Sequence, residues 1–391
     1  MSSTKFVIMD PWLSSVSGHF YEYDKSIIDE FKRRGIPVDI FAAENINPDI
    51  KESLGAVPFF HLLTKNSTSL SPHKLKSIIR EYKTFFDKTS PESVVFAPNI
   101  LSGKQLLIIA ITMLFISPNK YKKLVLLLRY IPDGANQKYF YKLAACLLKN
   151  KVIANKIIYT SDSELVARDC YNIFYQGVYV LPIPHVYEYT NKSIAEKKEL
   201  IKLFLPGEVR IDKGIFTILK AVELLISQNL FNAFELTVQY NPASSYKRHA
   251  EIGEYLYMLK EKVRIRILSS LSTDEYSFEF QAADIILAPY IAKNANGQLG
   301  YHSRTSGVFS EAVAAGKPVI TTKDTWMAHQ LEKFGSGICI TEDNYKELAE
   351  AFLKMSSSIN EYKKKAENAV VGWMSFHNSI SFCDKLIAIS N

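Results

Sequence analysis

Short apolar runs alternate with amphipathic stretches along the whole chain. In the first half the runs are KFVIMD (5–10), VDIFAA (38–43), SVVFAP (93–98), KLVLLLRY (123–130) and KIIYTSD (156–162). In the second half they are KLFLPGEV (202–209), ELTVQY (235–240), RIRILSS (264–270), IILAPY (285–290) and PVITT (318–322). Continuous apolar runs separated by helical stretches are typical of parallel sheets with helices on both faces. The pattern predicts an α/β protein with two doubly wound, Rossmann-like parallel-sheet domains.

A break separates the two sets of runs. LPIPHV (181–186) contains two prolines, and the polar stretch NKSIAEKKE follows at 191–199. A chain of 391 residues also suits two domains of roughly 150 to 200 residues each. We therefore expect a first domain over 1–185, a second over 186–373, and a hinge at LPIPHV. Because ligands of such sheets bind at the carboxyl ends of the strands, we expect the site in a cleft between the domains.

Positive charge is concentrated in one segment. Residues 101–156 contain ten Lys and Arg residues against the single acid Asp133, a net charge of +9, whereas the whole chain carries +7. The segment includes the apolar run LLIIAITMLFI (106–116), which is shorter than the about 20 residues that span a bilayer. Two interpretations stay open: a core helix with a solvated basic surround, or a surface that docks on anionic lipids. The stretch has no nucleic-acid-binding motif, so we expect no nucleic-acid partner.

Composition and cysteine usage indicate a globular protein of a reducing compartment. The chain is 47% hydrophobic and 22% charged, and its four cysteines form no CxxC pair. Neither a zinc site nor a disulfide framework is indicated. The N-terminal stretch MSSTKFVIMD lacks the pattern of a signal peptide. We expect a cytoplasmic protein, with the inner face of the membrane as a second location if the basic segment docks on lipid.

The first run is followed by a loop of small residues, DPWLSSVSGHF (10–20). Gly18 allows the backbone to approach a ligand closely, and the next segment supplies a helix N-terminus. The loop is not GxGxxG, which argues against a dinucleotide-binding dehydrogenase. His19 is a candidate for a catalytic or acceptor-facing group, with helix capping or packing as the alternative.

Two cations lie in the turn GEVRIDKG (207–214). Arg210 and Lys213 are expected to project from this turn, and Gly214 to open an amphipathic helix. Two cations beside a helix N-terminus suit a diphosphate, because the exposed amides and both charges act on the same anion. The alternative is an ordinary solvated turn.

The segment SRTSGVFSEAVAAGKPVITT (303–322) resembles a second phosphate cradle. Thr305, Ser306 and Gly307 are expected to begin a helix whose N–H groups face the cleft. Glu311 is the single acid of this apolar helix. A carboxylate accepts two hydrogen bonds from a vicinal diol such as that of a ribose. The alternative is a surface acid without a ligand.

The turn GEVRIDKG, the run ADIILAPY (283–290) and the segment SGVFSEAVAAGKPVI together resemble the donor domain of GT-B fold glycosyltransferases, particularly the retaining family 4. The resemblance is strongest over about residues 200–340. It implies that Lys213 and Arg210 hold the diphosphate of a nucleotide sugar and that Glu311 holds the ribose. It also implies that a helix over about 374–391 packs back on the first domain. The expected donor-binding set is Gly18, Arg210, Lys213, Ser303, Thr305, Ser306, Gly307 and Glu311.

The resemblance implies transfer of a hexose with retention, from a nucleotide-sugar substrate to a glycan or lipid-linked acceptor in bacterial-type surface polysaccharide assembly. We expect Lys213, Arg210 and helix amides to stabilise the departing diphosphate, with His19 as a further catalytic candidate. Arg129 and Asp133, from LRYIPDG (128–134), are the candidates on the acceptor side. No DxD-type motif is present, and neither a metal ion nor a cofactor is expected.

Two positions depart from the family pattern. Glu208 stands where family members commonly have Arg, a place that Arg210 could fill, and Ser303 stands where they commonly have a second Glu. These departures keep two alternatives open. One is a non-catalytic glycosyltransferase-like scaffold subunit, and the other is an epimerase or phosphorylase of the same fold.

Overall fold

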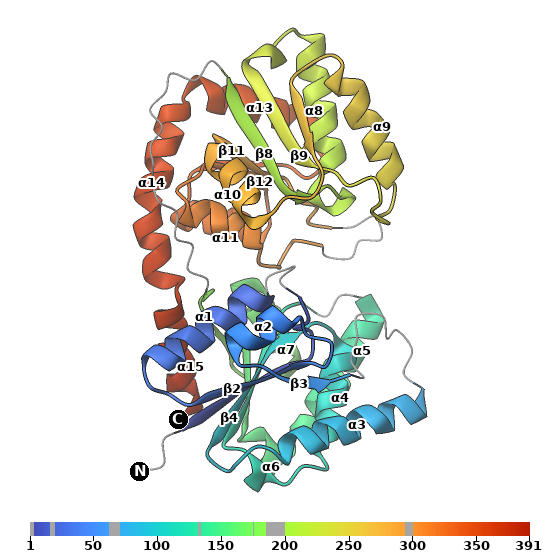
Figure 1. Ribbon diagram of the computed structural model, residues 1–391, viewed down its shortest axis with the longest axis vertical. Helices are drawn as coiled ribbons and strands as arrows, with labels where there is room; N and C mark the ends of the chain where they lie inside the picture. The colour runs from blue at the N-terminus through green and yellow to red at the C-terminus, as the bar shows by residue number, and fades with distance from the viewer. Residues whose placement is uncertain are drawn as a thin grey trace. The chain divides into compact units, whose positions relative to one another are not determined.

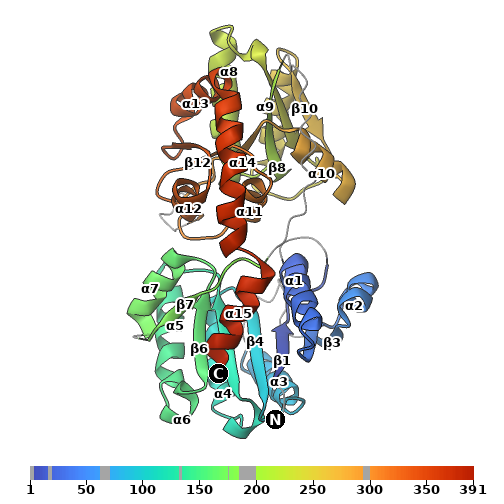
Figure 2. The same ribbon diagram turned by 90° about the vertical axis from the view of Figure 1, so that its left-hand side faces the viewer.

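The computed structural model describes residues 4–15, 20–61, 71–131, 134–174, 176–184, 200–293 and 300–391. The chain divides into two compact units (Figures 1 and 2). The first unit comprises Met1–Val186 and Phe376–Asn391, and the second comprises Tyr187–Ser375. Each unit contains one sheet whose strands are all parallel and are connected by helices. The predicted class, two doubly wound parallel α/β domains, is confirmed.

The sheet of the first unit has seven strands in the order β3-β2-β1-β4-β5-β6-β7. Their bounds are β1 Lys5–Asp10, β2 Val38–Ala43, β3 Val57–Phe60, β4 Ser93–Ile100, β5 Lys123–Leu128, β6 Ile157–Ser161 and β7 Val178–Val180. The helices are α1 Phe20–Arg33, α2 Pro48–Leu54, α3 Pro72–Phe86, α4 Gly103–Met113, α5 Gly134–Leu148, α6 Lys151–Ala154, α7 Glu164–Phe174 and α15 Ser379–Ser390. The chain runs outward from β1 to β3 and returns to β4. The strand order therefore reverses between β1 and β4, where ligands of such sheets bind.

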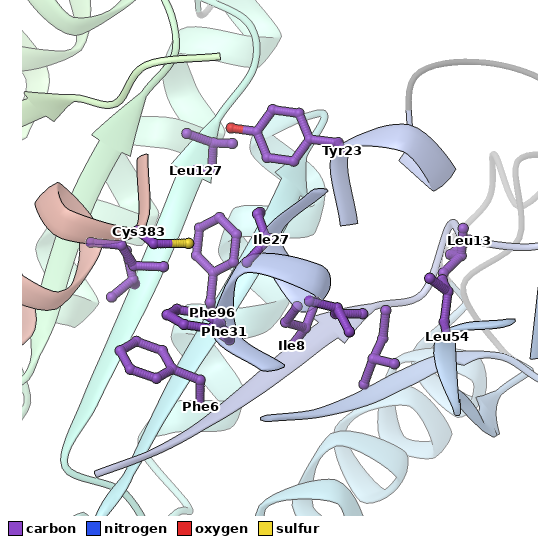
Figure 3. Packing of buried hydrophobic residues seen from close by; sticks show 14 of the residues in the cluster. Phe6, Ile8, Leu13, Tyr23, Ile27, Phe31, Leu54, Phe96, Leu127 and Cys383 are labelled. Carbon is purple, nitrogen blue, oxygen red and sulfur yellow. The ribbon is translucent and has the colours of Figure 1, made fainter. Parts of the chain in front are cut away.

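Helices α1 and α15 cover the same face of this sheet (Figure 3). Phe6 of β1 stacks on Phe31 of α1 with ring centroids 4.4 Å apart. Phe382 of α15 meets Tyr23 of α1 edge-on at 5.6 Å. Cys383 is fully buried in this core, and burial raises the pKa of its thiol to about 12. The C-terminal helix is therefore part of the hydrophobic core of the first unit.

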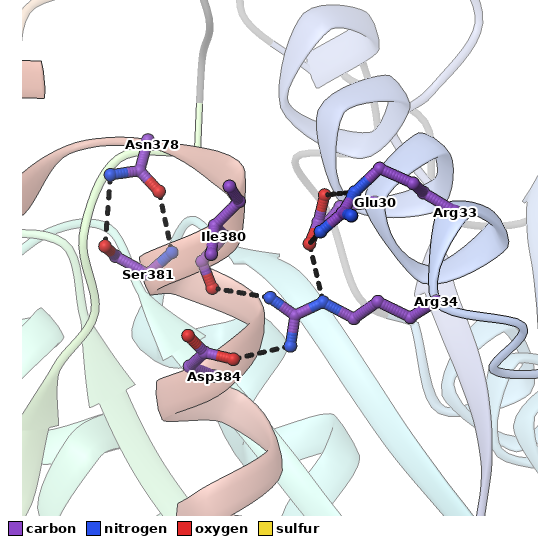
Figure 4. A network of polar contacts seen from close by, with 7 residues as sticks. All are labelled: Glu30, Arg33, Arg34, Asn378, Ile380, Ser381 and Asp384. Atoms are coloured by element: carbon purple, nitrogen blue, oxygen red, sulfur yellow. Dashed lines mark hydrogen bonds and ion pairs between the residues drawn. The ribbon is translucent and has the colours of Figure 1, made fainter. Parts of the chain in front are cut away.

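A polar network fastens α15 to α1 at the edge of this core (Figure 4). Glu30 accepts hydrogen bonds from Arg33 at 2.7 and 2.8 Å and from Arg34 at 2.5 Å. Arg34 also forms an ion pair with Asp384 and donates to the carbonyl of Ile380 at 3.1 Å. The hydrogen bonds from Arg33, and then the one from Arg34, hold the pKa of Glu30 at about 2 against the effect of burial.

The sheet of the second unit has six strands in the order β10-β9-β8-β11-β12-β13. The strands are β8 Ile201–Glu208, β9 Phe234–Gln239, β10 Ile265–Leu268, β11 Ile285–Ala288, β12 Val319–Thr322 and β13 Gly337–Ile340. The helices are α8 Ile215–Ser227, α9 His249–Lys260, α10 Thr273–Ala282, α11 Gly307–Ala314, α12 Trp326–Phe334, α13 Tyr345–Ser357 and α14 Ile359–Phe376. Here the strand order reverses between β8 and β11, so the segments that follow these two strands lie side by side.

We expect Glu30→Gln to destabilise the first unit at pH 7 by about 1–2 kcal/mol, because the amide cannot match the charge-assisted bonds to Arg33 and Arg34. The pKa of Glu30 lies below its usual value of 4.5. Its stabilisation is therefore complete above about pH 4.5 and is lost as the pH falls toward 2. Thermal melts of the two proteins should converge over that range. Asp29→Asn removes an exposed partner of Lys25 and is the control. Equal stability of Glu30→Gln and wild type at pH 7 would contradict the prediction.

Candidate functional site

A tight turn of residues 209–214 follows β8 at the carboxyl edge of the second sheet. It contains the short 3-10 helix Ile211–Lys213, and Gly214 then begins α8 with φ at 74°. A Cβ atom at Gly214 would lie 2.1 Å from the carbonyl oxygen of Pro289, which follows β11. Only glycine meets both requirements, the positive φ and the close approach. The turn therefore packs directly on the segment that leaves the neighbouring strand.

Lys213 is buried in this turn, with 8% of its surface exposed. Its Nζ donates a hydrogen bond to the carbonyl of Pro206 at 2.8 Å. A Cβ atom at Gly207 would lie 2.7 Å from this Nζ, so the lysine folds closely over the glycine. Burial, and then the positive charge of Arg210, lower the pKa of Lys213 to about 7. At neutral pH the amine is divided between its charged and neutral forms, and a nearby anion would favour the charged form.

Arg210 is held from three sides. Its guanidinium donates to both carboxylate oxygens of Asp212, at 2.9 and 3.1 Å. It also donates to the hydroxyl of Tyr301 at 3.2 Å, and its central carbon lies 5.6 Å from the centre of the Tyr246 ring. The sequence predicts two adjacent cations here. In the structure Asp212 pairs with one of them, and burial lowers the pKa of the other.

The N-terminus of α11 lies at the same edge of the sheet. The amide of Ile291 donates to the carbonyl of Asp212 at 3.0 Å, and the amide of Tyr301 donates to the carbonyl of Ile291 at 2.9 Å. Ser306 caps α11 by accepting a hydrogen bond from the amide of Phe309 at 3.3 Å. These contacts join the turn after β8 to the segment that enters α11. Ser303 is buried in that segment and Thr305 is half-buried.

Glu311 lies one turn further along α11. Its surface is 9% exposed, so it is not a solvated acid of the helix surface. Its Oε2 accepts a hydrogen bond from the hydroxyl of Tyr276 in α10 at 2.8 Å. Tyr276 is a neighbour that the sequence analysis does not identify, since no motif connects α10 with α11. In the described part of the chain, no three His, Cys, Asp or Glu residues form a group that could hold a metal ion.

Arg129, the acceptor-side candidate of the first unit, follows β5 and is also paired. It forms an ion pair with Asp162, which follows β6, and its side chain is 11% exposed. It donates to the carbonyl of Pro98 at 2.9 Å and to Oδ1 of Asn99 at 3.2 Å. Its guanidinium carbon lies 4.2 Å from the centre of the Tyr23 ring.

The other candidates of this unit, Gly18, His19 and Asp133, lie outside the described residues.

Two buried carboxyl groups complete this edge of the first sheet, and the sequence analysis does not identify them. Asp10 ends β1 and accepts hydrogen bonds from the amide of Trp12 at 2.9 Å and from Asn99 at 2.8 Å. Asp24 of α1 is its neighbour, and both side chains are fully buried. Burial raises the pKa of both groups, and the charge of Asp10 raises that of Asp24 further. Of the two carboxyl groups, Asp24 is therefore the one whose pKa is raised further.

The second unit matches a known family of sequences. The family is described as Glycosyl transferases group 1, and the match covers residues 188–370. No curated protein is similar enough in sequence to count as a match.

Three solved structures that resemble this chain in fold are distant from it in sequence. HepE of Anabaena, solved in complex with UDP, has a TM-score of 0.69 and 14% identity, over 98% of this chain and 99% of its own. A glycosyltransferase from Rickettsia africae has a TM-score of 0.71 and 14% identity, over 99% of this chain and 98% of its own. WaaG, a glycosyltransferase involved in lipopolysaccharide biosynthesis, has a TM-score of 0.61 and 15% identity, over 98% of this chain and 99% of its own. These likenesses show the GT-B fold.

We expect Lys213→Met to stabilise the ligand-free protein at pH 7 by about 1–3 kcal/mol, because it removes an amine that burial disfavours in its charged form. The unfolded chain keeps the lysine proton up to about pH 10.5, whereas the folded chain loses it near pH 7. The free energy of unfolding of the wild type should therefore rise between about pH 7 and pH 10.5. Over this range the difference in stability between Lys213→Met and the wild type should shrink. Thermal melts from pH 6 to 10 test this. Lys220→Met, at an exposed position of α8, is the control. A Lys213→Met protein that melts below wild type at pH 7 would contradict it.

Proposed function

Since the second unit matches the group 1 glycosyl transferases and the chain has the GT-B fold, we propose that the protein transfers a sugar from a nucleotide-sugar donor to a glycan or lipid-linked acceptor. The observation that carries this proposal is the grouping of Arg210, Lys213 and the N-terminus of α11 at one sheet edge. Two cations and a helix N-terminus suit a diphosphate, because the exposed amides and both charges act on the same anion.

The diphosphate and the ribose of the donor each have candidate partners in the second unit. Lys213 and Arg210 hold the diphosphate, the amides near Ser306 and Gly307 hold its distal phosphate, and Glu311 holds the ribose. HepE was solved with UDP and with UDP-glucose, which supports a nucleotide sugar as the donor and makes UDP the first nucleotide to test. The donor is a substrate, and the proposal includes no further cofactor.

The chemistry assigned to this site is stabilisation of the leaving group. Negative charge grows on the nucleoside diphosphate as the glycosidic bond breaks. Lys213 and Arg210 sit where they would offset that charge, so the proposed transfer needs no metal ion. We assign transfer of a hexose with retention. Arg129 is the described candidate on the acceptor side, and its pairing with Asp162 makes it a fixed rather than a mobile cation.

The acceptor that we propose belongs to surface polysaccharide assembly. WaaG, which shares the fold, is involved in lipopolysaccharide biosynthesis, and this supports the proposal. None of the described helices is both long enough and apolar enough to cross a bilayer. Most residues of the apolar run 106–116 are buried in the core, including Leu106, Ile109 and Met113 of α4. A lipid-linked acceptor would therefore be reached by a protein that docks on the membrane surface.

Exposed groups on α4 and α5 suit such docking. Phe115, just after α4, is 60% exposed, and Tyr139 on α5 is 62% exposed. Lys104, Lys138, Lys142 and Lys149 are exposed on the same two helices or at their ends, and the two helices pack together (Figure 1). Aromatic side chains beside lysines are typical of surfaces that bind anionic lipid.

We expect the donor to bind through Lys213 and Glu311 and the chemistry to depend mainly on Lys213. A nucleotide that binds at 100 times its dissociation constant should stabilise the wild type by about 2.7 kcal/mol, which a thermal-shift panel of UDP, GDP, CMP and their sugars detects. Glu311→Gln should weaken binding, because the amide loses one acceptor for the ribose hydroxyls. Lys213→Met should lower turnover by about 10²- to 10³-fold, more than it lowers affinity.

The control for these variants is Glu350→Gln, at an exposed acid of α13 that should leave binding and turnover unchanged. Wild-type affinity and turnover in a folded Glu311→Gln protein would remove the ribose assignment. Epimerised nucleotide sugar formed without acceptor would replace the transferase by an epimerase. Nucleotide binding without hydrolysis or transfer of any donor would favour a scaffold subunit.

In flotation assays we expect the wild type to float with vesicles that contain anionic lipid and not with neutral vesicles. Salt should weaken this binding. Replacing Lys138 and Lys142 by Glu should reduce this binding by about tenfold or more, since each basic residue near the surface contributes about 1 kcal/mol. The matched control replaces Lys346 and Lys364, exposed in the second unit, by Glu. Equal binding to both kinds of vesicle, or equal loss in the two double variants, would contradict a docking surface on α5.

A further inference from the structure

Glu208, at the end of β8, makes its contacts with a loop rather than with the phosphate candidates. The pairing of β8 with β9 shifts register between Leu205 and Glu208, which is an irregularity that redirects side chains. Beyond it, Oε1 of Glu208 accepts a hydrogen bond from the amide of Asn241 at 2.9 Å. Asn241 begins the segment 241–248, here called the 241–248 loop, which joins β9 to α9. The carboxylate therefore fixes the start of this loop.

His249, at the end of the loop, fixes the same residue from the other side. It is 5% exposed, and its Nε2 donates to the carbonyl of Asn241 at 2.7 Å. The same nitrogen lies 3.4 Å from Oε1 of Glu208. The ring of Tyr240 stacks on the imidazole with centroids 4.5 Å apart. Both ends of the loop are thus joined through the main-chain N–H and C=O groups of Asn241.

The loop carries Tyr246 to the guanidinium of Arg210. The amide of His249 donates to the carbonyl of Tyr246 at 3.2 Å, so the position of Tyr246 follows that of His249. The Tyr246 ring lies 5.6 Å from the central carbon of Arg210, and the residue is 45% exposed. A cation over an aromatic face is attracted to it, and an ordered ring restricts the rotamers of the arginine. A loosened loop would remove one of the contacts that hold Arg210.

We infer that Glu208 is a positioning residue of the proposed donor site, which holds Arg210 in place through the 241–248 loop and Tyr246. The inference rests on the proposed function, because it takes Arg210 as a ligand of the donor diphosphate. The charge of Glu208 also has two electrostatic effects of opposite sign on a bound diphosphate. It repels the anion directly, and it raises the pKa of Lys213 and so favours the charged amine that attracts the anion. Glu208→Gln removes this charge but keeps the acceptor, and it therefore separates both effects from the contact with the loop.

The test measures the affinity of the tightest ligand among UDP, GDP and ADP by titration calorimetry. Glu208→Ala should weaken binding by about five- to tenfold, and Glu208→Gln, which keeps an acceptor for the Asn241 amide, should stay within about twofold of wild type. Tyr246→Ala, at an exposed position, should weaken binding to the same degree as Glu208→Ala.

The double variant Glu208→Ala with Arg210→Ala should bind no worse than Arg210→Ala alone, since the effect of Glu208 passes through Arg210. Glu251→Gln, at an exposed acid of α9, is the matched control.

The outcomes separate this inference from the proposed function. Hydrogen exchange of the free protein should be faster in the 241–248 loop of Glu208→Ala than in wild type. Unchanged or tighter binding by Glu208→Ala, additive losses in the double variant, or unchanged exchange would overturn the role of Glu208 alone. Failure of the wild type to bind any of the three nucleotides would overturn the donor site itself, and that failure is recognised without any variant. Melting temperatures of the variants show that each is folded.

Discussion

The contact between Gly214 and the carbonyl of Pro289 is the constraint on which the candidate site depends. The strand order reverses between β8 and β11, so the segments after these strands lie beside each other only if nothing separates them. A side chain at 214 would push them apart, because its Cβ would lie 2.1 Å from the carbonyl oxygen. With glycine there, the turn that carries Arg210 and Lys213 lies against the segment that leads to α11. The convergence of cations and helix N-terminus thus follows from the absence of one side chain.

Both units bury charged groups at the carboxyl edges of their sheets, where burial costs free energy. Lys213 has a lowered pKa, and Asp10 and Asp24 have raised ones, and in each case burial is the largest cause. Apolar residues of similar size would pack at these positions at lower cost. Such costs are concentrated at functional sites in proteins in general. The cluster at the edge of the first sheet is therefore where acceptor-side residues of the proposed transfer should be sought first.

Most of the strands that could be predicted from the sequence are central ones. Each central strand is a continuous apolar run because it is buried on both faces, and nine of the ten predicted runs correspond to central strands. The tenth run corresponds to β10, which lies at the edge of the second sheet. The strands without such a signal are β3, β7 and β13, which lie at the edges of the sheets. β3 contains Pro58, and β13 begins at Gly337 and has three half-buried residues, so neither reads as a buried strand. Edge strands bury less surface, and their sequences are correspondingly less apolar.

The sequence does not predict which side chains contact one another across different elements. The turn after β8 and the helix with Glu311 could be found because glycines and a lone acid interrupt apolar runs. The hydrogen bond from Tyr276 to Glu311 joins two helices that no motif connects. The sequence allows Arg210 to fill the place that family members commonly give to Arg and that Glu208 occupies here. What Glu208 does instead depends on Asn241, a neighbour supplied only by the pairing of β8 with β9.

These partners also change the electrostatics of the proposed donor site. Arg210 and Lys213 would form a doubly charged patch if they were free. In the structure, Asp212 is paired with Arg210, Glu208 lies nearby, and burial lowers the pKa of Lys213 to about 7. The ligand-free turn is therefore close to neutral and attracts small anions weakly. A diphosphate differs because its several charges favour protonation of Lys213 and compete with Asp212 for Arg210. Its binding would create the positive charge that the bond-breaking step requires, so that charge is present mainly when the donor is in place.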